Sequence, residues 1–299
     1  MLNFPHMHRM IKTTGTLLAL LFCFAIQAQS KLLENLKMES KLLDYDVEYS
    51  VYLPPDYDQS MRAYPVVYLL HGYTDDETGW TQFGEVKRIA DKAIASGEIP
   101  PMIIIMPDGK VTWYMNDHQG TEPWEDMFVQ EFIPHVESEY RIRAKKEFRG
   151  ISGLSMGGFG SLRLSMAHPD LFAACAAYSA AIWSDQQFTK MPRRQYERMF
   201  NKLFGEGLKD EKRLTDHYKA HSVIGMAQNN NVAELKKVRY YFDCGDDDGL
   251  TVGNALLHIA LKERRIPHEY RVRDGAHTWS FWRHSLPIGL KFIGESFRR

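Results

Sequence analysis

Apolar and polar positions along the chain predict strands that alternate with helices. Residues 47–54 (VEYSVYLP) alternate apolar with polar, whereas residues 66–70 (VVYLL) and 102–106 (MIIIM) are continuous apolar runs. Alternation is typical of a strand with one face toward solvent, and a continuous apolar run is typical of a strand buried on both faces of a parallel sheet. We therefore predict one outer strand followed by two central strands.

The same alternation continues toward the middle of the chain. Residues 86–96 and 125–139 carry apolar side chains at helical spacing, and residues 147–152, 157–167 and 172–178 have the patterns of a strand, a helix and a strand. Strands that alternate with helices form mainly parallel sheets covered by helices on both faces. The predicted fold class is α/β.

The pattern changes at residue 183. Residues 183–232 are rich in charged and polar side chains, with apolar residues at helix-like spacing. The earlier alternation then resumes with a strand at 238–244, a helix at 255–263, a strand at 268–272 and a closing helix at 287–297. We interpret residues 183–232 as an excursion above the sheet, within a single domain of residues 29–299.

The N-terminus has the order of segments found in secretory signal peptides. Arg9 and Lys12 precede an apolar run at 16–26, which is too short to span a bilayer, and Ala28 stands close behind it. We predict a signal peptide of residues 1–28, cleavage near Ala28 and a secreted or periplasmic product. A lipid anchor at Cys23 would need a small residue before it, and Phe22 occupies that position, so we expect no membrane anchor.

Charge and cysteine content exclude several classes of function. The 37 Lys and Arg residues nearly balance the 38 Asp and Glu residues, which gives no electrostatic reason to expect a nucleic-acid partner. After the signal peptide only Cys175 and Cys244 remain, both inside apolar segments, so we expect buried free thiols. Chemistry based on cysteine is not predicted.

One motif carries a nucleophile. Residues 153–157 read Gly-Leu-Ser-Met-Gly and fit G-x-S-x-G between a predicted strand and a predicted helix, which is the context that this motif requires. Such a turn lifts the serine hydroxyl away from the sheet and directs the following amides at a developing oxyanion. Ser155 is the predicted nucleophile.

Serine needs a base, and His277 is the predicted one. In proteins that carry this serine motif on a strand-to-helix turn, the chain order is serine, acid, histidine. His277 follows the last predicted strand, in a loop able to return over the serine. The other candidates fit less well: His258 falls in a helix pattern, His268 begins a strand, and His284 lies a helical turn or two further on.

The acid is expected after the strand that ends at Cys244, where Asp246, Asp247 and Asp248 follow in succession. One of them would orient the histidine, and the others are expected to be solvated turn residues. An EF-hand interpretation of this segment fails, because Cys244 and Ala255 would occupy its first and twelfth ligand positions.

No cofactor or metal is predicted. His217 and His221 have the i, i+4 spacing of a metal-binding pair, but no Glu follows His217, so we interpret the pair as lying on a surface helix. A second oxyanion donor is expected from the loop that begins at His71 and Gly72, because glycine there permits a close backbone approach. The backbone amides of Tyr73 and Met156 are the predicted oxyanion hole.

These motifs resemble the esterase D-like group, carbohydrate esterase family 1, whose members include feruloyl and acetylxylan esterases and whose fold is the α/β-hydrolase fold. The matching segments follow the family's order along the chain: YLLHGYTDDETGW (68–80), IIIMPDG (103–109), WYMND (113–117), GLSMGG (153–158), FDCGDDDGL (242–250) and GAHTWSFWRHSLP (275–287). The resemblance implies that the acid is Asp248, the fourth residue after the cysteine. Gly249 departs from the family pattern, which usually has a bulkier residue, and this keeps Asp247 as a fallback.

The resemblance implies a serine carboxylic ester hydrolase that removes feruloyl or acetyl groups from xylan-type polysaccharide. Export argues against the family's S-formylglutathione hydrolases, and nothing indicates a mycolyltransferase or a siderophore esterase. Two alternatives remain: a general short-chain esterase or acyltransferase, and a catalytically silent binding protein. Six aromatic residues are candidates for stacking a phenolic ring or a sugar, although core packing is the commoner role of such residues: Trp113, Tyr114, Trp124, Trp183, Trp279 and Trp282.

Overall fold

The structure is a computed structural model that describes residues 1–2 and 29–297. The predicted signal peptide, including its cleavage site near Ala28, therefore lies outside the described residues except for its first two. Within the described ranges, no helix is both long enough and apolar enough to cross a membrane.

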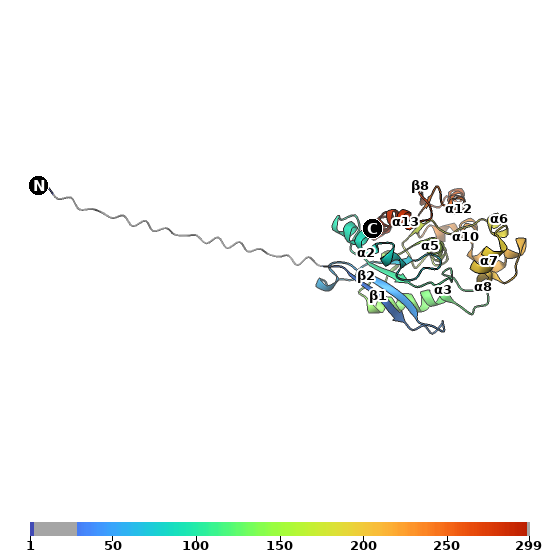
Figure 1. Cartoon of the computed structure of the whole chain (residues 1–299), viewed down its shortest axis with the longest axis horizontal. Coiled ribbons are helices and arrows are strands. Elements are labelled where there is room, and N and C mark those ends of the chain that lie inside the picture. Colours follow the sequence, from blue (N-terminus) through green and yellow to red (C-terminus); the bar gives the residue numbers. More distant parts are fainter. Residues whose placement is uncertain (3–28, 298–299) are drawn as a thin grey trace.

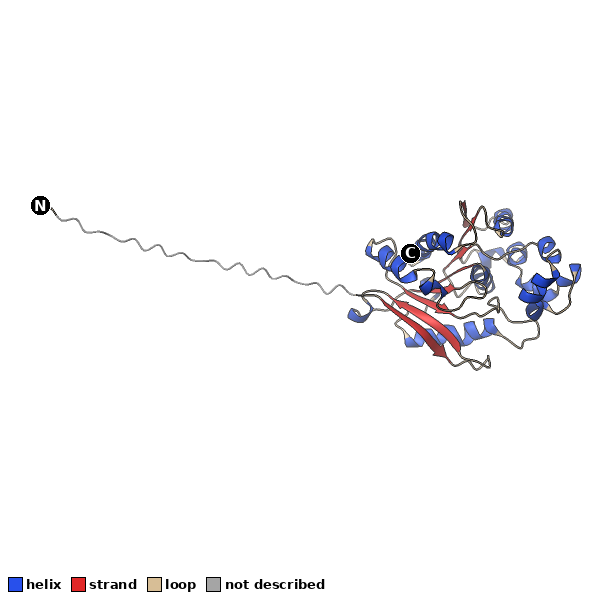
Figure 2. Ribbon diagram, in the orientation of Figure 1, coloured by secondary structure: helices blue, strands red, loops and turns tan. Residues whose placement is uncertain are grey.

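An eight-stranded sheet forms the centre of the protein, in the order β1-β2-β4-β3-β5-β6-β7-β8 (Figure 2). β1 pairs antiparallel with β2 and β2 antiparallel with β4, while all the remaining neighbours are parallel. This confirms the predicted α/β fold with a mainly parallel sheet. The strands are β1 (Lys31–Met38), β2 (Val47–Leu53), β3 (Val66–Leu70), β4 (Ile103–Pro107), β5 (Arg149–Leu154), β6 (Ala174–Tyr178), β7 (Arg239–Gly245) and β8 (His268–Arg273).

The continuous apolar runs are buried on both faces, as the pattern predicts. Every residue of β3 is buried. Val66, Tyr68 and Leu70 pack into one core, and Val67 and Leu69 pack into the other, because successive strand side chains point to opposite faces. Each such aliphatic side chain contributes about 1.5–3 kcal/mol through burial.

Helices cover both faces of the sheet (Figure 1). α2 and α13 pack on one face, and α4, α5 and α12 pack on the other. The helices outside the β6–β7 connection are α1 (Gly79–Gln82), α2 (Val86–Ala95), α3 (Trp124–Met127), α4 (Ile133–Glu139), α5 (Met156–Ala167), α12 (Thr251–Glu263) and α13 (Trp279–Ser296). A π-helical turn, Phe128–Phe132, joins α3 to α4, and short 3₁₀ turns occupy Tyr57–Gln59 and Lys146–Phe148.

Among the elements that differ from the sequence expectation are β1 and α13. β1 was not predicted, because its apolar residues do not alternate regularly; the structure accommodates them with a register shift between Leu33 and Leu36. α13 begins at Trp279 instead of residue 287, since Pro287 lies inside the helix and not at its start. Thr278 caps this helix by accepting a hydrogen bond from the amide of Phe281.

Short helices fill the connection between β6 and β7, the region predicted as an excursion, and they lie at the end of the molecule remote from β1 (Figure 1). Aromatic rings form their core; those of Phe188 and Tyr218, for example, stack with centroids 4.2 Å apart. The helices are α6 (Asp185–Thr189), α7 (Arg193–Met199), α8 (Asn201–Phe204), α9 (Asp216–His221), α10 (Val223–Asn229) and α11 (Val232–Leu235), with a 3₁₀ turn at Asp210–Arg213.

Arg213 should hold this helical connection together. Its buried guanidinium donates hydrogen bonds to the carbonyl oxygens of Phe188, Thr189 and Met191, at the C-terminal end of α6. We expect Arg213→Ala to lower the free energy of unfolding by about 2–3 kcal/mol, because buried carbonyl groups lose a charged donor. Thermal and urea unfolding measure this. The exposed Arg194 on α7 provides the control: Arg194→Ala should stay within about 0.5 kcal/mol of wild type, and equal losses in both variants would contradict the prediction.

Candidate active site

Ser155 lies on a strained turn between β5 and α5. Its backbone has φ 53° and ψ −115°, a conformation that non-glycine residues rarely adopt. The motif glycines make the turn possible, since a Cβ at Gly157 would overlap the carbonyl oxygens of Leu70 and His71, and one at Gly153 would lie 2.5 Å from the backbone of Gly157. The amide of Ser155 donates to the carbonyl of Tyr178 at 2.9 Å. The strain is therefore fixed by close packing against β3 and β6.

The structure brings the three predicted triad side chains into one hydrogen-bonded chain. His277 Nε2 lies 3.0 Å from Ser155 Oγ, and His277 Nδ1 lies 2.8 Å from Asp248 Oδ2. Asp248 comes from the loop after β7 and His277 from the loop after β8, so the three residues meet at the C-terminal edge of the parallel sheet. With its Nδ1 hydrogen on Asp248, the imidazole can accept the serine proton at Nε2.

Asp248, and not the fallback Asp247, contacts His277. Asp248 Oδ1 also accepts the amide of Leu250 at 2.9 Å. Burial by itself would raise the pKa of the Asp248 carboxyl, but the hydrogen bonds from His277 and Leu250 and the charge of His277 together hold that pKa below its usual value. The carboxylate is thus ionised at neutral pH. The side chain of Asp247, in contrast, is exposed.

Hydrogen bonds tie the acid loop to the histidine loop. The amides of Asp246 and Asp247 donate to the carbonyls of Arg273 and Gly275, each at 3.0 Å, and the amide of Gly275 donates to Asp246 Oδ1 at 3.0 Å. Asp246 was expected to be a solvated turn residue. It is exposed, but its carboxylate joins the two loops that carry Asp248 and His277.

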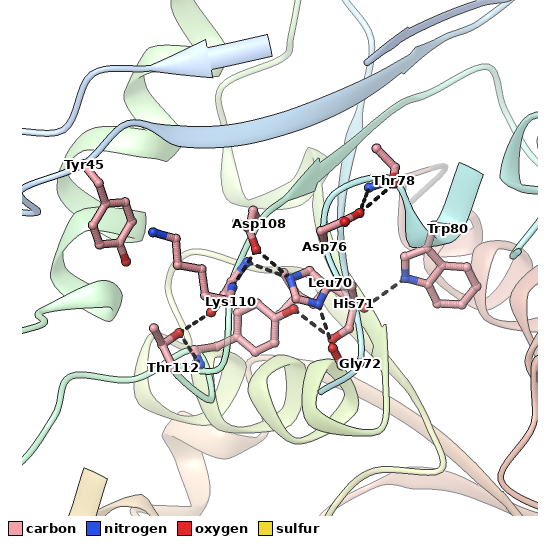
Figure 3. A network of polar contacts seen from close by, with 12 residues as sticks. Tyr45, Leu70, His71, Gly72, Asp76, Thr78, Trp80, Asp108, Lys110 and Thr112 are labelled. Carbon is pink, nitrogen blue, oxygen red and sulfur yellow. Dashed lines mark hydrogen bonds and ion pairs between the residues drawn. The ribbon is translucent and has the colours of Figure 1, made fainter. Parts of the chain in front are cut away.

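The predicted oxyanion donors lie on either side of Ser155. Within the described ranges, neither the amide of Tyr73 nor that of Met156 donates to a protein acceptor, so both are free to bind a substrate oxygen. Side-chain hydrogen bonds hold the Tyr73 loop in place (Figure 3). His71 Nδ1 donates to the carbonyl of Gly72, and His71 Nε2 accepts the amide of Gly109, both at 2.8 Å, while Tyr114 Oη donates to the carbonyl of His71.

The other histidines weighed as candidates from the sequence take structural positions. His258 and His268 hydrogen-bond each other at 2.7 Å, and His284 donates to the carbonyl of Ser280. His217 and His221 lie on a helix, as expected, but they are not surface residues: both are partly buried, and burial lowers the pKa of His221 to about 4. Tertiary packing of α9 against the core, which the local spacing does not reveal, accounts for this correction.

Acidic side chains gather at one further place. Among the described residues, one set of His, Cys, Asp or Glu side chains is close enough to share a metal ion, namely the exposed Asp246, Asp247 and Asp274. Asp246 already accepts backbone hydrogen bonds there. Within the described residues, Cys175 and Cys244 are buried and free, which confirms that expectation.

A cavity of about 640 Å³ opens above Ser155. Of the six aromatic candidates, Trp113, Trp183, Trp279 and Trp282 line it, whereas Tyr114 and Trp124 are buried in the core. Trp113 adopts a positive φ of 57°, a strained conformation found at the cavity wall.

Sequence reasoning gave no place in the cavity to several other lining residues, among them Asp75, Phe83, Gln195 and Met199. The i, i+4 spacing of Gln195 and Met199 on α7 was a signal that could have found that pair. Asp75 lies within the family-like segment 68–80 and Phe83 lies just after it, but neither carries a motif role of its own.

Comparison with known proteins agrees with this geometry. The model of the Esterase family matches residues 40–293. A solved structure of a ferulic acid esterase superposes with a TM-score of 0.78 and 31% sequence identity, covering 90% of this chain and 99% of that one. These matches confirm the resemblance to the esterase D-like group and the α/β-hydrolase fold.

Two of the curated relatives are longer proteins. An esterase of Mycobacterium tuberculosis is 24% identical over 261 residues, which make up 81% of this chain and 55% of the relative. The endo-1,4-beta-xylanase/feruloyl esterase of Xylanibacter ruminicola is 30% identical over 145 residues, covering 46% of this chain and 20% of that protein. The chain thus spans about half the length of the first of these relatives and a fifth of the second.

The acid of the triad can be tested by two amide substitutions. We expect Asp248→Asn to lower kcat by about 10⁴-fold, because an amide cannot hold His277 in the tautomer that accepts the serine proton. Asp247→Asn removes the same charge from the neighbouring position and should change kcat less than about threefold. Steady-state kinetics on p-nitrophenyl acetate measure both. If Asp247→Asn were the inactive variant, Asp247 would be the acid.

A glycine pair in the same loop tests the packing of the two loops. A Cβ at Gly245 would overlap the carbonyl oxygen of Gly275, whereas a Cβ at Gly249 meets no atom within 4 Å. We expect Gly245→Ala to push the loops apart, to reduce kcat by about 10²-fold and to lower the melting temperature. Gly249→Ala should have a much smaller effect on both. Similar kinetics for the two variants would show that contact between the loops does not position the triad.

Proposed function

The chain belongs to the Esterase family, and from that premise we propose that it is a serine carboxylic ester hydrolase that removes feruloyl or acetyl groups from xylan-type polysaccharide. The observation that carries the proposal is the hydrogen-bonded chain from Ser155 through His277 to Asp248 at the base of an aromatic-lined cavity. Such a chain on a strained strand-to-helix turn suits acyl transfer.

In the proposed first half-reaction, Ser155 Oγ attacks the ester carbonyl carbon while His277 Nε2 takes the hydroxyl proton. The carbonyl oxygen becomes an oxyanion that the amides of Tyr73 and Met156 stabilise. His277 then returns the proton to the leaving alcohol oxygen as the carbon–oxygen bond breaks, which leaves an acyl-Ser155 ester. Asp248 keeps its charge throughout and stabilises the imidazolium.

In the second half-reaction, water replaces the alcohol. His277 accepts a proton from the water, whose oxygen attacks the acyl carbon, and returns that proton to Ser155 Oγ as the acid departs. The His277 side chain is 37% exposed and faces the cavity, so water reaches Nε2 without a rearrangement of the protein. The same groups therefore serve both steps, and no cofactor enters either one.

The lining of the cavity favours an uncharged ester with an aromatic part. Phe83, Trp279 and Trp282 form one group of touching rings, and Trp113 and Trp183 form another. No Lys or Arg belongs to the part of the cavity that the structure describes. Anionic thioesters of the glutathione type would find no cation there, whereas a feruloyl ring would find apolar faces on which to stack.

Feruloyl esters are the preferred substrate within the proposal. A pocket of about 640 Å³ is large for an acetyl group alone, and it falls in the range that encloses a small aromatic ligand. The similar structure at 31% identity is named as a ferulic acid esterase, and the Xylanibacter relative carries both xylanase and feruloyl esterase in its name. Acetyl groups on the same polymer remain the second substrate of the proposal.

We also propose that the enzyme acts outside the cytoplasm, because residues 1–28 have the pattern of a signal peptide. N-terminal sequencing of protein exported by the producing cell would test this: a start near Gln29 supports export, and an intact Met1 contradicts it.

The activity is tested by comparing wild type with Ser155→Ala on methyl ferulate, acetylated xylan and p-nitrophenyl acetate. We expect wild type to prefer feruloyl esters by kcat/KM and Ser155→Ala to lose about 10⁶-fold in kcat, since the nucleophile is gone. Hydrolysis of p-nitrophenyl acetate alone would favour a general short-chain esterase, and ester transfer to an added sugar would favour an acyltransferase. Failure of a fluorophosphonate to label Ser155 would favour a catalytically silent binding protein.

A further inference from the structure

One carboxylate in the active-site cavity has no part in the proposed triad. Asp75 lies in the loop after β3, two residues beyond the proposed oxyanion donor Tyr73, and it lines the same cavity as Ser155 and His277. Among the described lining residues, Asp75 and Asp248 are the carboxylates, and Asp248 is occupied by His277. Asp75 is thus the acidic group that remains available to a bound molecule.

Protein groups leave the Asp75 carboxyl poorly compensated. Among the described residues, the backbone amide of Asp76 donates a hydrogen bond to it, and no side chain does. Partial burial raises the pKa of this carboxyl, and the hydrogen bond from the Asp76 amide offsets only part of that rise. A half-buried carboxylate that accepts only this backbone hydrogen bond has acceptor capacity left, which a ligand hydroxyl can satisfy.

A glycine at the start of the neighbouring helix leaves room for this carboxyl. A Cβ on Gly79, the first residue of α1, would overlap both carboxylate oxygens and the carboxyl carbon of Asp75. Gly79 lies in a helix, where alanine is ordinarily the better residue. The side chain of Asp75 therefore depends on a glycine at position 79 to keep its present place beside the cavity.

Aromatic side chains line the same cavity as this carboxylate. Phe83, which follows α1, packs against Trp279 with ring centroids 5.8 Å apart, and both rings line the cavity with Asp75. A ring or a sugar that stacks on these faces can present a hydroxyl group at its edge to a carboxylate. Apolar faces next to one charged acceptor form a site for a ligand that combines a flat apolar body with a hydroxyl donor.

We propose that Asp75 is a specificity-determining residue that accepts a hydrogen bond from a hydroxyl group of the ester substrate. The proposal rests on the hydrolase function proposed above and names what that site selects. The donor is either the phenolic hydroxyl of a feruloyl-type acyl group or a hydroxyl of the sugar that carries the ester. In both cases the ligand is neutral, and an anionic group at this place is repelled.

The test compares esters that differ in the phenolic hydroxyl or in the sugar. Methyl ferulate and methyl 3-methoxycinnamate differ only in the phenolic hydroxyl, and 5-O-feruloyl arabinose adds the sugar to the ferulate. For wild type we expect kcat/KM to favour at least one hydroxyl-bearing ester over its partner by about tenfold or more, the usual effect of a hydrogen bond to a charged acceptor. In Asp75→Ala that ratio should fall close to one, and in Asp75→Asn, which keeps an acceptor oxygen, it should take an intermediate value.

The two kcat/KM ratios show whether the phenol or the sugar donates the hydrogen bond. If Asp75→Ala removes the preference for methyl ferulate over methyl 3-methoxycinnamate, the donor is the phenol. If it removes only the preference for feruloyl arabinose over methyl ferulate, the donor is the sugar. Ratios that stay at their wild-type values in Asp75→Ala would overturn the proposal, as would an equal loss on all esters, which is the mark of a merely structural role.

Two further variants test the position of the Asp75 carboxylate and the effect of a charge next to it. Gly79→Ala keeps Asp75 but displaces its carboxyl, so we expect the hydroxyl preference to fall while the melting temperature is maintained. Asp76→Asn removes an exposed charge from the adjacent position, outside the cavity, and should leave the preference unchanged. A wild-type enzyme that cleaves none of these cinnamoyl esters refutes the proposed function itself, which is a different result from cleavage without hydroxyl preference.

Discussion

The position of every reactive group depends on the strained turn at Ser155. A positive φ at a non-glycine residue costs of order 1–3 kcal/mol, and it persists only where the surroundings permit no alternative. Here β5 is paired on both sides, and the amide of Ser155 donates to Tyr178 while its carbonyl accepts from Phe159 and Ala181. Gly157 closes the turn directly against the end of β3. The Ser155 hydroxyl therefore has a fixed position, and the loops that carry Asp248 and His277 converge on it.

Patterns that depend on the interior of the sheet were predictable from the sequence. Continuous apolar runs such as 66–70 must be buried on both faces, and the chain order of Ser155, acid and His277 follows from the α/β-hydrolase topology. The choice of Asp248 over its neighbours required the resemblance to a family. Its local sequence offers three equivalent carboxylates, and only the register of the loop against β8 decides which one meets the imidazole.

Features that depend on contacts between distant segments were not predictable. His217 and His221 were interpreted as residues of a surface helix, but the packing of α9 partly buries them. Asp246 resembles any turn residue until the histidine loop is placed beside it. Asp75 had no recognisable role in the sequence for the same reason, because its role depends on a cavity that loops distant in the chain form together.

The helices between β6 and β7 link specificity to catalysis. α7 brings Gln195 and Met199 into the cavity, and the hydroxyl of Tyr73 donates to the carbonyl of Arg198 on the same helix at 3.1 Å. The residue whose amide is the proposed oxyanion donor is thereby fastened to the segment that shapes the pocket. The helix that brings Gln195 and Met199 to the cavity is thus also a hydrogen-bond partner of the loop that carries the proposed oxyanion donor, and the rate of acyl transfer is sensitive to the placement of such a donor. Sequence changes in α7 therefore bear on both the shape of the pocket and the support of the Tyr73 loop.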